Sequence, residues 1–288
     1  MNSLGILPDY KRCTLCQRML IFPSYVDGDY YFYCCLCLVW INWRDKTPLQ
    51  RSKVSYKDLM RLIDLFVQNK SPSQASDIFN DSIFESSLNR NTISRYFKML
   101  GRIAFLYYQQ KLHSILLDGE VEVDETVVFK PKRTYARRYR RYKLRNMWLL
   151  GMIERGSKRF VIIPIKNRNE TTLMMSILKF VNCNATIFTD CHSVYVNNRK
   201  TPKESRVIAY GYNHQYIDHS EEFVSSHFQH IHTNTIERLW RSVKTDLRMK
   251  KVTVGYVSAI ARYYFHKTLT KEEQIKYIRN YIHSNYLD

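Results

Sequence analysis

The stretch that decides the fold is Gly119-Glu120-Val121-Glu122-Val123-Asp124-Glu125-Thr126-Val127-Val128-Phe129. Its valines alternate with polar residues, a pattern that predicts a β-strand. Because side chains alternate across a strand, Glu122, Asp124 and Thr126 share one face. A carboxylate on a central strand is tolerated mainly when it is paired or bound to a metal ion. Asp124 is therefore a candidate site residue.

The segments after this strand predict an α/β domain with a mixed sheet flanked by helices. Two further strands are joined by a turn at Gly156, and Asn169 is the expected N-cap of the next helix. A short apolar run, 185–189, then delivers Asp190 at its carboxyl end, where open sheets commonly place functional side chains. We therefore predict that Asp124 and Asp190 converge.

A third acid comes from residues 232–247, which have the apolar period of a helix. One stripe of that helix holds Asn234, Glu237, Arg241 and Lys244. The packing side holds Ile236, Leu239, Trp240, Val243 and Leu247. Glu237 can face the two aspartates, or it can close a capping box with Asn234 as N-cap, and the segment alone leaves both readings open. Arg241 and Lys244 are candidate contacts to a DNA phosphate.

The segment 130–145 holds nine basic residues, no acids and several interleaved tyrosines. Such a run binds phosphates, and its tyrosines can stack on unpaired bases. A solvated loop and a nuclear localisation signal are the alternatives. Because the run follows the strand of Asp124, we favour DNA contact through its basic side chains, among them Lys132, Arg133, Arg137, Arg138, Arg140 and Arg141.

Five of the seven cysteines lie within the first 37 residues. Two pairs of the form C-x-x-C, separated by 17 residues, have the spacing of a zinc ribbon, and a hairpin is expected between them at Asp27-Gly28-Asp29. The predicted Zn²⁺ ligands are Cys13, Cys16, Cys34 and Cys37, with Cys35 to spare. Disulfides are the alternative, but they suit secreted chains, and no export signal is seen.

The residues between about 55 and 100 have helical periodicity in three segments, a plan that resembles a helix-turn-helix module. Ser71 and Pro72 are expected at the start of the second helix. The third helix would present Arg90, Arg95 and Lys98 outward, where they can contact DNA. The alternative is a helical linker with a solvated charged face.

The whole chain of 288 residues is strongly basic, with 45 Lys and Arg against 26 Asp and Glu and a formal net charge of +19. This balance favours a nucleic-acid partner. No apolar run approaches the roughly 20 residues that span a bilayer, so neither a membrane helix nor membrane binding is expected. We expect a nuclear protein if the host is eukaryotic, and otherwise a cytoplasmic one associated with the nucleoid.

Several blocks of the chain, in this order, resemble Merlin-type transposases and their bacterial insertion-sequence relatives. These blocks are the amino-terminal cysteine motif, 121–126, 148–156, 187–190 and 232–237. The resemblance implies an RNase H-like catalytic domain, recognition of terminal inverted repeats, and a DDE-type metal site formed by Asp124, Asp190 and Glu237. Some bacterial relatives use the asparagine of the last block, so Asn234 is the alternative third ligand.

Together these features predict four parts and one leading function. The parts are a zinc ribbon at 1–50, a helix-turn-helix-like module at 51–115, the catalytic domain at 116–255 and C-terminal helices at 256–288. The expected function is cut-and-paste DNA transposition by a homo-oligomer, with two Mg²⁺ or Mn²⁺ ions on carboxylate oxygens. The alternatives are a sequence-specific DNA-binding protein without catalytic activity and an RNase H-fold nuclease.

Overall fold

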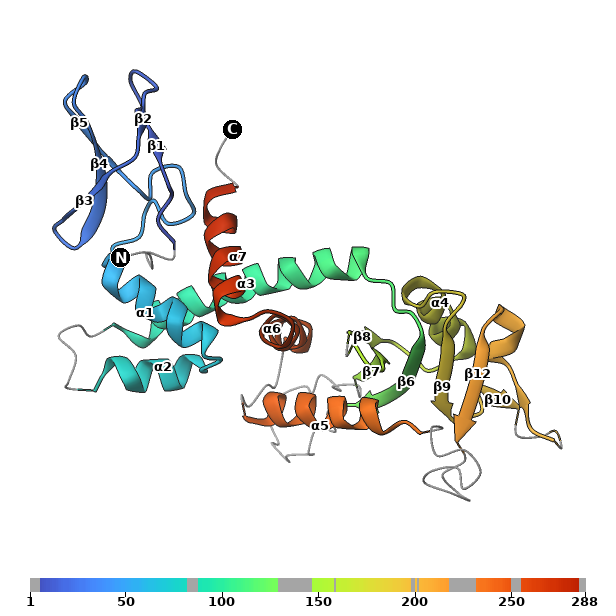
Figure 1. The fold of residues 1–288 in the computed structure, drawn as a ribbon. Helices are drawn as coiled ribbons and strands as arrows, with labels where there is room; N and C mark the ends of the chain where they lie inside the picture. The colour runs from blue at the N-terminus through green and yellow to red at the C-terminus, as the bar shows by residue number, and fades with distance from the viewer. Residues whose placement is uncertain are drawn as a thin grey trace. The chain divides into compact units, whose positions relative to one another are not determined.

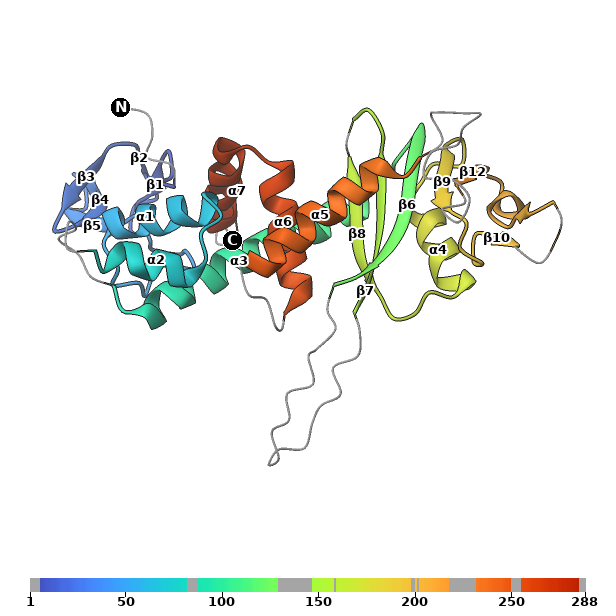
Figure 2. The ribbon, with the colours of Figure 1, turned by 90° about the horizontal axis from the view of Figure 1, so that it is seen from below.

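The computed structural model describes residues 6–81, 88–128, 147–157, 159–197, 200, 202–217, 232–249 and 255–284, without the side chains of 248 and 249. The chain forms two compact units, one made of Met1–Gln109 with Ala261–Asp288 and the other of Gln110–Ile260 (Figures 1 and 2). Each unit is described by itself. No helix in the described ranges is both long and apolar enough to cross a membrane.

The second unit is built on a five-stranded sheet with the order β12-β9-β6-β7-β8. Its strands are β6 (Glu120–Val127), β7 (Trp148–Glu154), β8 (Phe160–Ile165), β9 (Thr186–Asp190) and β12 (Asn213–Ile217). Strands β6, β7 and β8 form an antiparallel meander, whereas β9 runs parallel to β6 and β12 parallel to β9. This order and these directions define an RNase H-like domain, and the predicted fold class is confirmed.

One face of the sheet packs on helix α4 (Glu170–Phe180), which makes the crossover from β8 to the parallel strand β9 (Figure 2). Asn169 caps this helix as expected, because its side chain accepts a hydrogen bond from the backbone N–H of Thr172 at 2.9 Å. The core on this face includes Val121, Val123, Leu150, Met152, Leu173 and Ile177.

The other face of the sheet is covered by helix α5 (Asn234–Met249), which lies along β6 and β7 (Figures 1 and 2). The helix starts one residue later than the capping-box reading requires. The backbone N–H of Glu237 bonds to the carbonyl of Thr233 at 3.2 Å, so Thr233 is the N-cap. Asn234 therefore lies inside the first turn, and that reading is wrong.

The short elements β10 (Val196–Asn197), β11 (Glu204–Ser205) and the 3₁₀ helix η1 (Val207–Tyr210) complete the second unit. Strands β10 and β11 pair in an antiparallel hairpin. They lie between β9 and β12 in the chain, so they make up the crossover between these two parallel strands.

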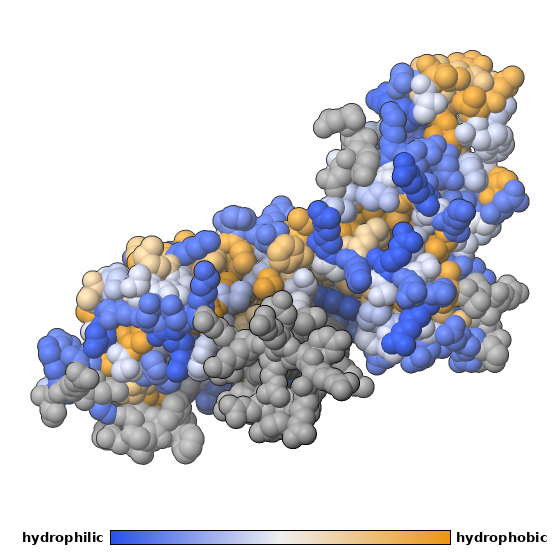
Figure 3. Space-filling view, turned by 180° about the vertical axis from the view of Figure 1, so that it is seen from behind, coloured by the Kyte–Doolittle hydropathy of each residue, from blue (hydrophilic) through white to orange (hydrophobic). Residues whose placement is uncertain are grey.

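The first unit begins with two small sheets that carry the cysteine motif. They are β1 (Lys11–Arg12) with β2 (Met19–Leu20), and β3 (Pro23–Val26) with β4 (Asp29–Cys34) and β5 (Val39–Asn42). The expected hairpin lies between β3 and β4. Its turn residues Asp27 and Gly28 both have positive φ, as a tight hairpin turn requires. Figure 3 shows apolar side chains gathered on this module, among them Leu15, Ile21, Phe22, Leu36 and Leu38.

The helices of the first unit are α1 (Tyr56–Val67), α2 (Pro72–Phe79), α3 (Arg90–Ser114), α6 (Tyr256–Thr268) and α7 (Lys271–Ser284). Ser71 and Pro72 are the N-cap and first residue of α2, as expected. Phe66 of α1 packs against Phe97 of α3 at a centroid distance of 5.8 Å. Arg262 of α6 lies 4.4 Å from the centre of Phe66, so residues after 260 join this core.

Candidate active site and metal centre

Asp124 and Asp190 lie on neighbouring parallel strands. The last paired residues of β6 and β9 are Glu122 and Phe188, and each aspartate comes two residues later on its strand. Asp190 is also held by the chain that follows it, because its Oδ1 accepts a hydrogen bond from the backbone N–H of His192 at 3.1 Å. The two aspartates thus end adjacent strands on the same side of the sheet.

Asp124 is tied to helix α5 by a side-chain hydrogen bond. The indole Nε1–H of Trp240 donates to Asp124 Oδ2 at 2.8 Å. Burial, and then the charge of Asp190, raise the pKa of Asp124 to about 6, and the charge of Glu237 adds to this rise. The three acids are therefore electrostatic neighbours, as a shared cation site requires.

The helix presents both candidates for the third ligand in its first turn. Asn234 is partly buried and Glu237 is exposed. Within the described ranges, the amino-terminal cysteines are the one group of histidine, cysteine or acidic ligand atoms that all lie within 4.8 Å of one another. The three carboxylates border a common region without closing into so tight a group.

Carboxylate oxygens are the ligands that Mg²⁺ prefers, and the mutual repulsion that raises the pKa of Asp124 is what a bound cation relieves. The donor chemistry of Asp124, Asp190 and Glu237 therefore fits a divalent metal ion.

Glu122 is a functional candidate that the sequence placed on the right face without assigning it a role. Its side chain is fully buried, and its Oε1 lies 2.8 Å from Nε of Arg155. Its Oε2 accepts a hydrogen bond from the backbone N–H of Ile236 in the first turn of α5. The alternation around Asp124 could have marked this carboxylate, but no local signal identifies partners so far away in the chain.

Glu125 lies on the opposite face of β6 and accepts a hydrogen bond from the hydroxyl of the fully buried Tyr195. Burial raises the pKa of Glu125 to about 7, and the charges of Asp124 and Asp190 raise it further. The sequence reasoning missed this residue. The available signal was an acid at a position of the strand that faces the core.

His214 on β12 joins two elements next to Asp190. Its Nε2 lies 2.9 Å from the hydroxyl of Thr189, and its Nδ1 lies 2.7 Å from the hydroxyl of Ser205. Burial lowers the pKa of His214 to about 4, so its ring is neutral at neutral pH. This network fixes the end of β9, immediately before the aspartate.

The candidate DNA contacts fall into three groups. Arg241 is exposed and Lys244 is partly buried on α5. On α3, the exposed residues are Arg90, Arg95 and Lys98. The basic residues of the loop after β6 lie outside the described residues, namely Lys132, Arg133, Arg137, Arg138, Arg140 and Arg141.

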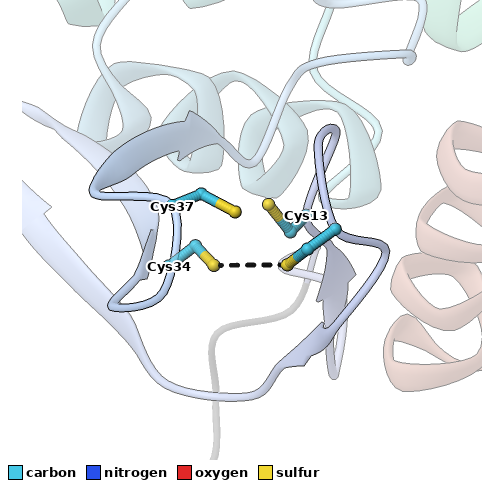
Figure 4. Close-up of side chains that lie close together, drawn as sticks. Cys13, Cys34 and Cys37 are labelled. Carbon is cyan, nitrogen blue, oxygen red and sulfur yellow. Dashed lines mark hydrogen bonds between the residues drawn. The ribbon is translucent and has the colours of Figure 1, made fainter.

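The four predicted zinc ligands come together in the first unit. The sulfur atoms of Cys13, Cys16, Cys34 and Cys37 all lie within 4.8 Å of one another, and Figure 4 shows three of these side chains pointing toward a common centre. The Sγ atoms of Cys16 and Cys34 are 3.7 Å apart. A tetrahedral Zn²⁺ with bonds of about 2.3 Å separates its sulfurs by about 3.8 Å, so the group fits zinc. The spare Cys35 is exposed.

The backbone around the first cysteine pair stabilises a thiolate. Hydrogen bonding from the backbone of Cys16 and Leu15 lowers the pKa of Cys13 to about 6. Since the thiolate is the form that binds metal, this environment favours metal binding at neutral pH.

An RNase H-like sheet with acids on two adjacent strands and on the covering helix defines the class of metal-dependent enzymes that cleave and join nucleic-acid strands. Residues 116–266, just over half of the chain, match the family described as the ISXO2-like transposase domain. The chain therefore belongs to this family of DDE transposases. It is a polynucleotidyl transferase that performs DNA strand cleavage and transfer, and its family implies divalent-metal catalysis.

Two solved structures also match, and both belong to retroviral proteins. The catalytic core domain of BIV integrase has 14% sequence identity and a TM-score of 0.33, over 59% of this chain and 99% of that chain. A chain of the simian T-cell lymphotropic virus intasome in complex with PP2A regulatory subunit B56 gamma has 13% identity and a TM-score of 0.33, over 57% of this chain and 56% of that chain. No curated protein matches the chain.

Proposed function

We propose that this protein binds the terminal inverted repeats of its own mobile element and moves that element by cut-and-paste transposition. The observation that carries the proposal is the approach of three acids, Asp124, Asp190 and Glu237, from two adjacent strands and one helix. Asn234 is the alternative to Glu237 as the third ligand.

The ions that suit this site are Mg²⁺ or Mn²⁺. Bound there, they would activate the attacking water or 3′-hydroxyl and stabilise the leaving oxygen. The chain's own residues orient the ligands: Trp240 holds one oxygen of Asp124, and the backbone N–H of His192 holds one oxygen of Asp190. Nucleophile and leaving group both come from water and DNA, so no covalent intermediate on the protein is required.

DNA would be bound by the exposed cations of both units. Arg241 and Lys244 lie one and two turns beyond Glu237, where they can hold phosphates flanking the scissile bond. Arg90, Arg95 and Lys98 of α3 would contact the inverted repeat, and the basic loop 130–145 would contact DNA near the cut. The net charge of +19 supports a polyanionic partner.

Zinc would occupy the four-cysteine cluster, making residues 1–50 a zinc ribbon, followed by a helix-turn-helix-like module at 51–115 and the catalytic domain at 116–255. The ribbon, together with the order of the catalytic blocks, supports the Merlin-type subgroup. Cutting two element ends in one complex requires more than one active site, so we propose that the active form is a homo-oligomer. It would act wherever the DNA of its host lies, in the nucleus or the nucleoid.

The test is cleavage of DNA that carries the element's own ends by the purified protein with Mg²⁺ or Mn²⁺. We expect Asp124→Ala, Asp190→Ala and Glu237→Gln to lose nicking at the repeat ends while retaining binding to them, and Asn234→Ala to distinguish the alternative ligand. Cleavage by Asp124→Ala at the wild-type rate would exclude this catalytic site. Equal cleavage of RNA–DNA hybrids would favour a general nuclease, and repeat binding without cleavage would favour a DNA-binding protein.

A further inference from the structure

The buried charge of Glu122 is compensated by two different parts of the second unit. Its side chain is fully buried on the sheet face that carries Asp124, and an unpaired carboxylate there would cost several kcal/mol. Oε1 pairs with Arg155 Nε at 2.8 Å, and Oε2 accepts from the backbone N–H of Ile236 at 2.8 Å. A single carboxylate thus connects the β7–β8 turn to the start of α5.

Arg155 is itself fixed on several sides. Its guanidinium lies 3.8 Å from the centre of the Phe188 ring, and one Nη contacts Glu120 at 3.0 Å. The other Nη donates to the backbone carbonyl of His232, directly before α5. The imidazole Nδ1 of His232 lies 3.4 Å from Glu122 Oε1. The arginine therefore contacts β6, β9 and the segment that leads into the helix.

The carboxylate also meets α5 where a negative charge is favourable. The backbone N–H of Ile236 is one of the first donors of the helix, which have no partner inside it, and the N-terminal end of a helix carries a partial positive charge. The direction of Glu122 thus fixes both the height and the rotation of the first turn. Asn234 and Glu237 lie in that same turn.

We propose that Glu122 and Arg155 are positioning residues that set the first turn of α5, and with it the third metal ligand, against Asp124. The inference rests on the proposed function in so far as α5 supplies that ligand. Both residues act through the helix and need no contact with the reacting atoms. A carboxylate that only stabilised the fold would change the amount of folded protein without changing the metal requirement of the folded fraction.

The test compares Glu122→Gln with Glu120→Gln, a matched control on the same strand. Glu120 also pairs with Arg155, but its side chain is half exposed and has no printed bond to α5. The first readout is the Mn²⁺ concentration that gives half-maximal cleavage of element ends. We expect Glu122→Gln to raise it about 10–100-fold, the usual effect of losing a residue that orients a metal ligand, and Glu120→Gln to change it less than about twofold.

The second readout is hydrogen–deuterium exchange of peptides covering 233–240, which needs no catalysis. We expect faster exchange there in Glu122→Gln and unchanged exchange in α4. Arg155→Lys keeps the charge beside Glu122 but cannot also reach His232, and the same changes are expected if Glu122→Gln does not fold. Equal metal requirement and equal exchange in Glu122→Gln or, where it does not fold, Arg155→Lys, and in the control would overturn the inference. A wild-type protein without cleavage activity would contradict the proposed function, and the exchange readout would still decide this one.

Discussion

The indole of Trp240 donates a hydrogen bond of 2.8 Å to the carboxylate of Asp124, so the helix that covers the sheet also orients an acid of the site. The contact is possible because residue 151, which pairs with Asp124 on β7, is glycine. A Cβ at this position would lie 2.5 Å from the Trp240 ring. Packing of the helix and placement of the carboxylate therefore depend on the same two residues.

Replacing Trp240 by phenylalanine is expected to shift the pH dependence of cleavage. The indole hydrogen bond lowers the pKa of Asp124, so its loss raises that pKa and a higher pH is needed to ionise the acid. A hydrogen bond to a charged group contributes about 1.5–3 kcal/mol, so the acid limb of the rate profile should move up by about one pH unit. The measurement is the cleavage rate from pH 5 to 9 at subsaturating Mg²⁺. Trp148→Phe, on β7, serves as the control, and an identical shift in both variants would contradict the assignment.

Gly151→Ala is expected to destabilise the second unit, because the new methyl group would overlap the Trp240 ring. Overpacking of this kind costs about 1–3 kcal/mol of unfolding free energy. Urea unfolding of the variant checks the magnitude, and Gly151→Ala combined with Trp240→Leu should recover stability but not cleavage. Gly101→Ala is the control, since no atom lies within 4 Å of its added methyl group and alanine favours a helix. A Gly151→Ala protein as stable as wild type would show that the helix can shift at little cost.

The comparison of sequence and structure separates local from long-range information. Strand alternation and the carboxyl end of an apolar run are local signals, and they placed Asp124 and Asp190 on adjacent strands correctly. The same alternation put Glu122 on the face of Asp124, but its partners Arg155 and Ile236 lie 33 and 114 residues away, where no pattern connects them. Periodicity assigned Trp240 to the packing side, which is right, without revealing that its N–H reaches Asp124.

The cysteine cluster is expected to bind one Zn²⁺ per chain, and Cys16→Ser should abolish this binding. The four sulfurs already lie within 4.8 Å of one another, and a structural zinc ion contributes directly to the folding of a small module. Metal analysis of the purified protein measures the stoichiometry. Cys35→Ser, next to a ligand but outside the cluster, should retain one equivalent. Retention of zinc by Cys16→Ser together with its loss from Cys35→Ser would mean that Cys35 is the true ligand.

Without Mg²⁺ or Mn²⁺, Asp124→Asn is expected to be more stable than the wild type at pH 7.5 and equally stable near pH 4. In the folded chain the pKa of Asp124 is raised from 3.8 to about 6, first by burial and then by the charge of Asp190. Between these two values the folded chain holds a proton that the unfolded chain has lost. This contribution to stability is present at low pH and is lost as the pH rises toward 6. Urea unfolding at several pH values measures the difference, with the exposed Asp118→Asn as the control. A constant difference between Asp124→Asn and wild type across this range would contradict the assignment. Added Mg²⁺ should restore the stability of the wild type at pH 7.5 and leave Asp124→Asn nearly unchanged, because binding to the folded state alone stabilises it.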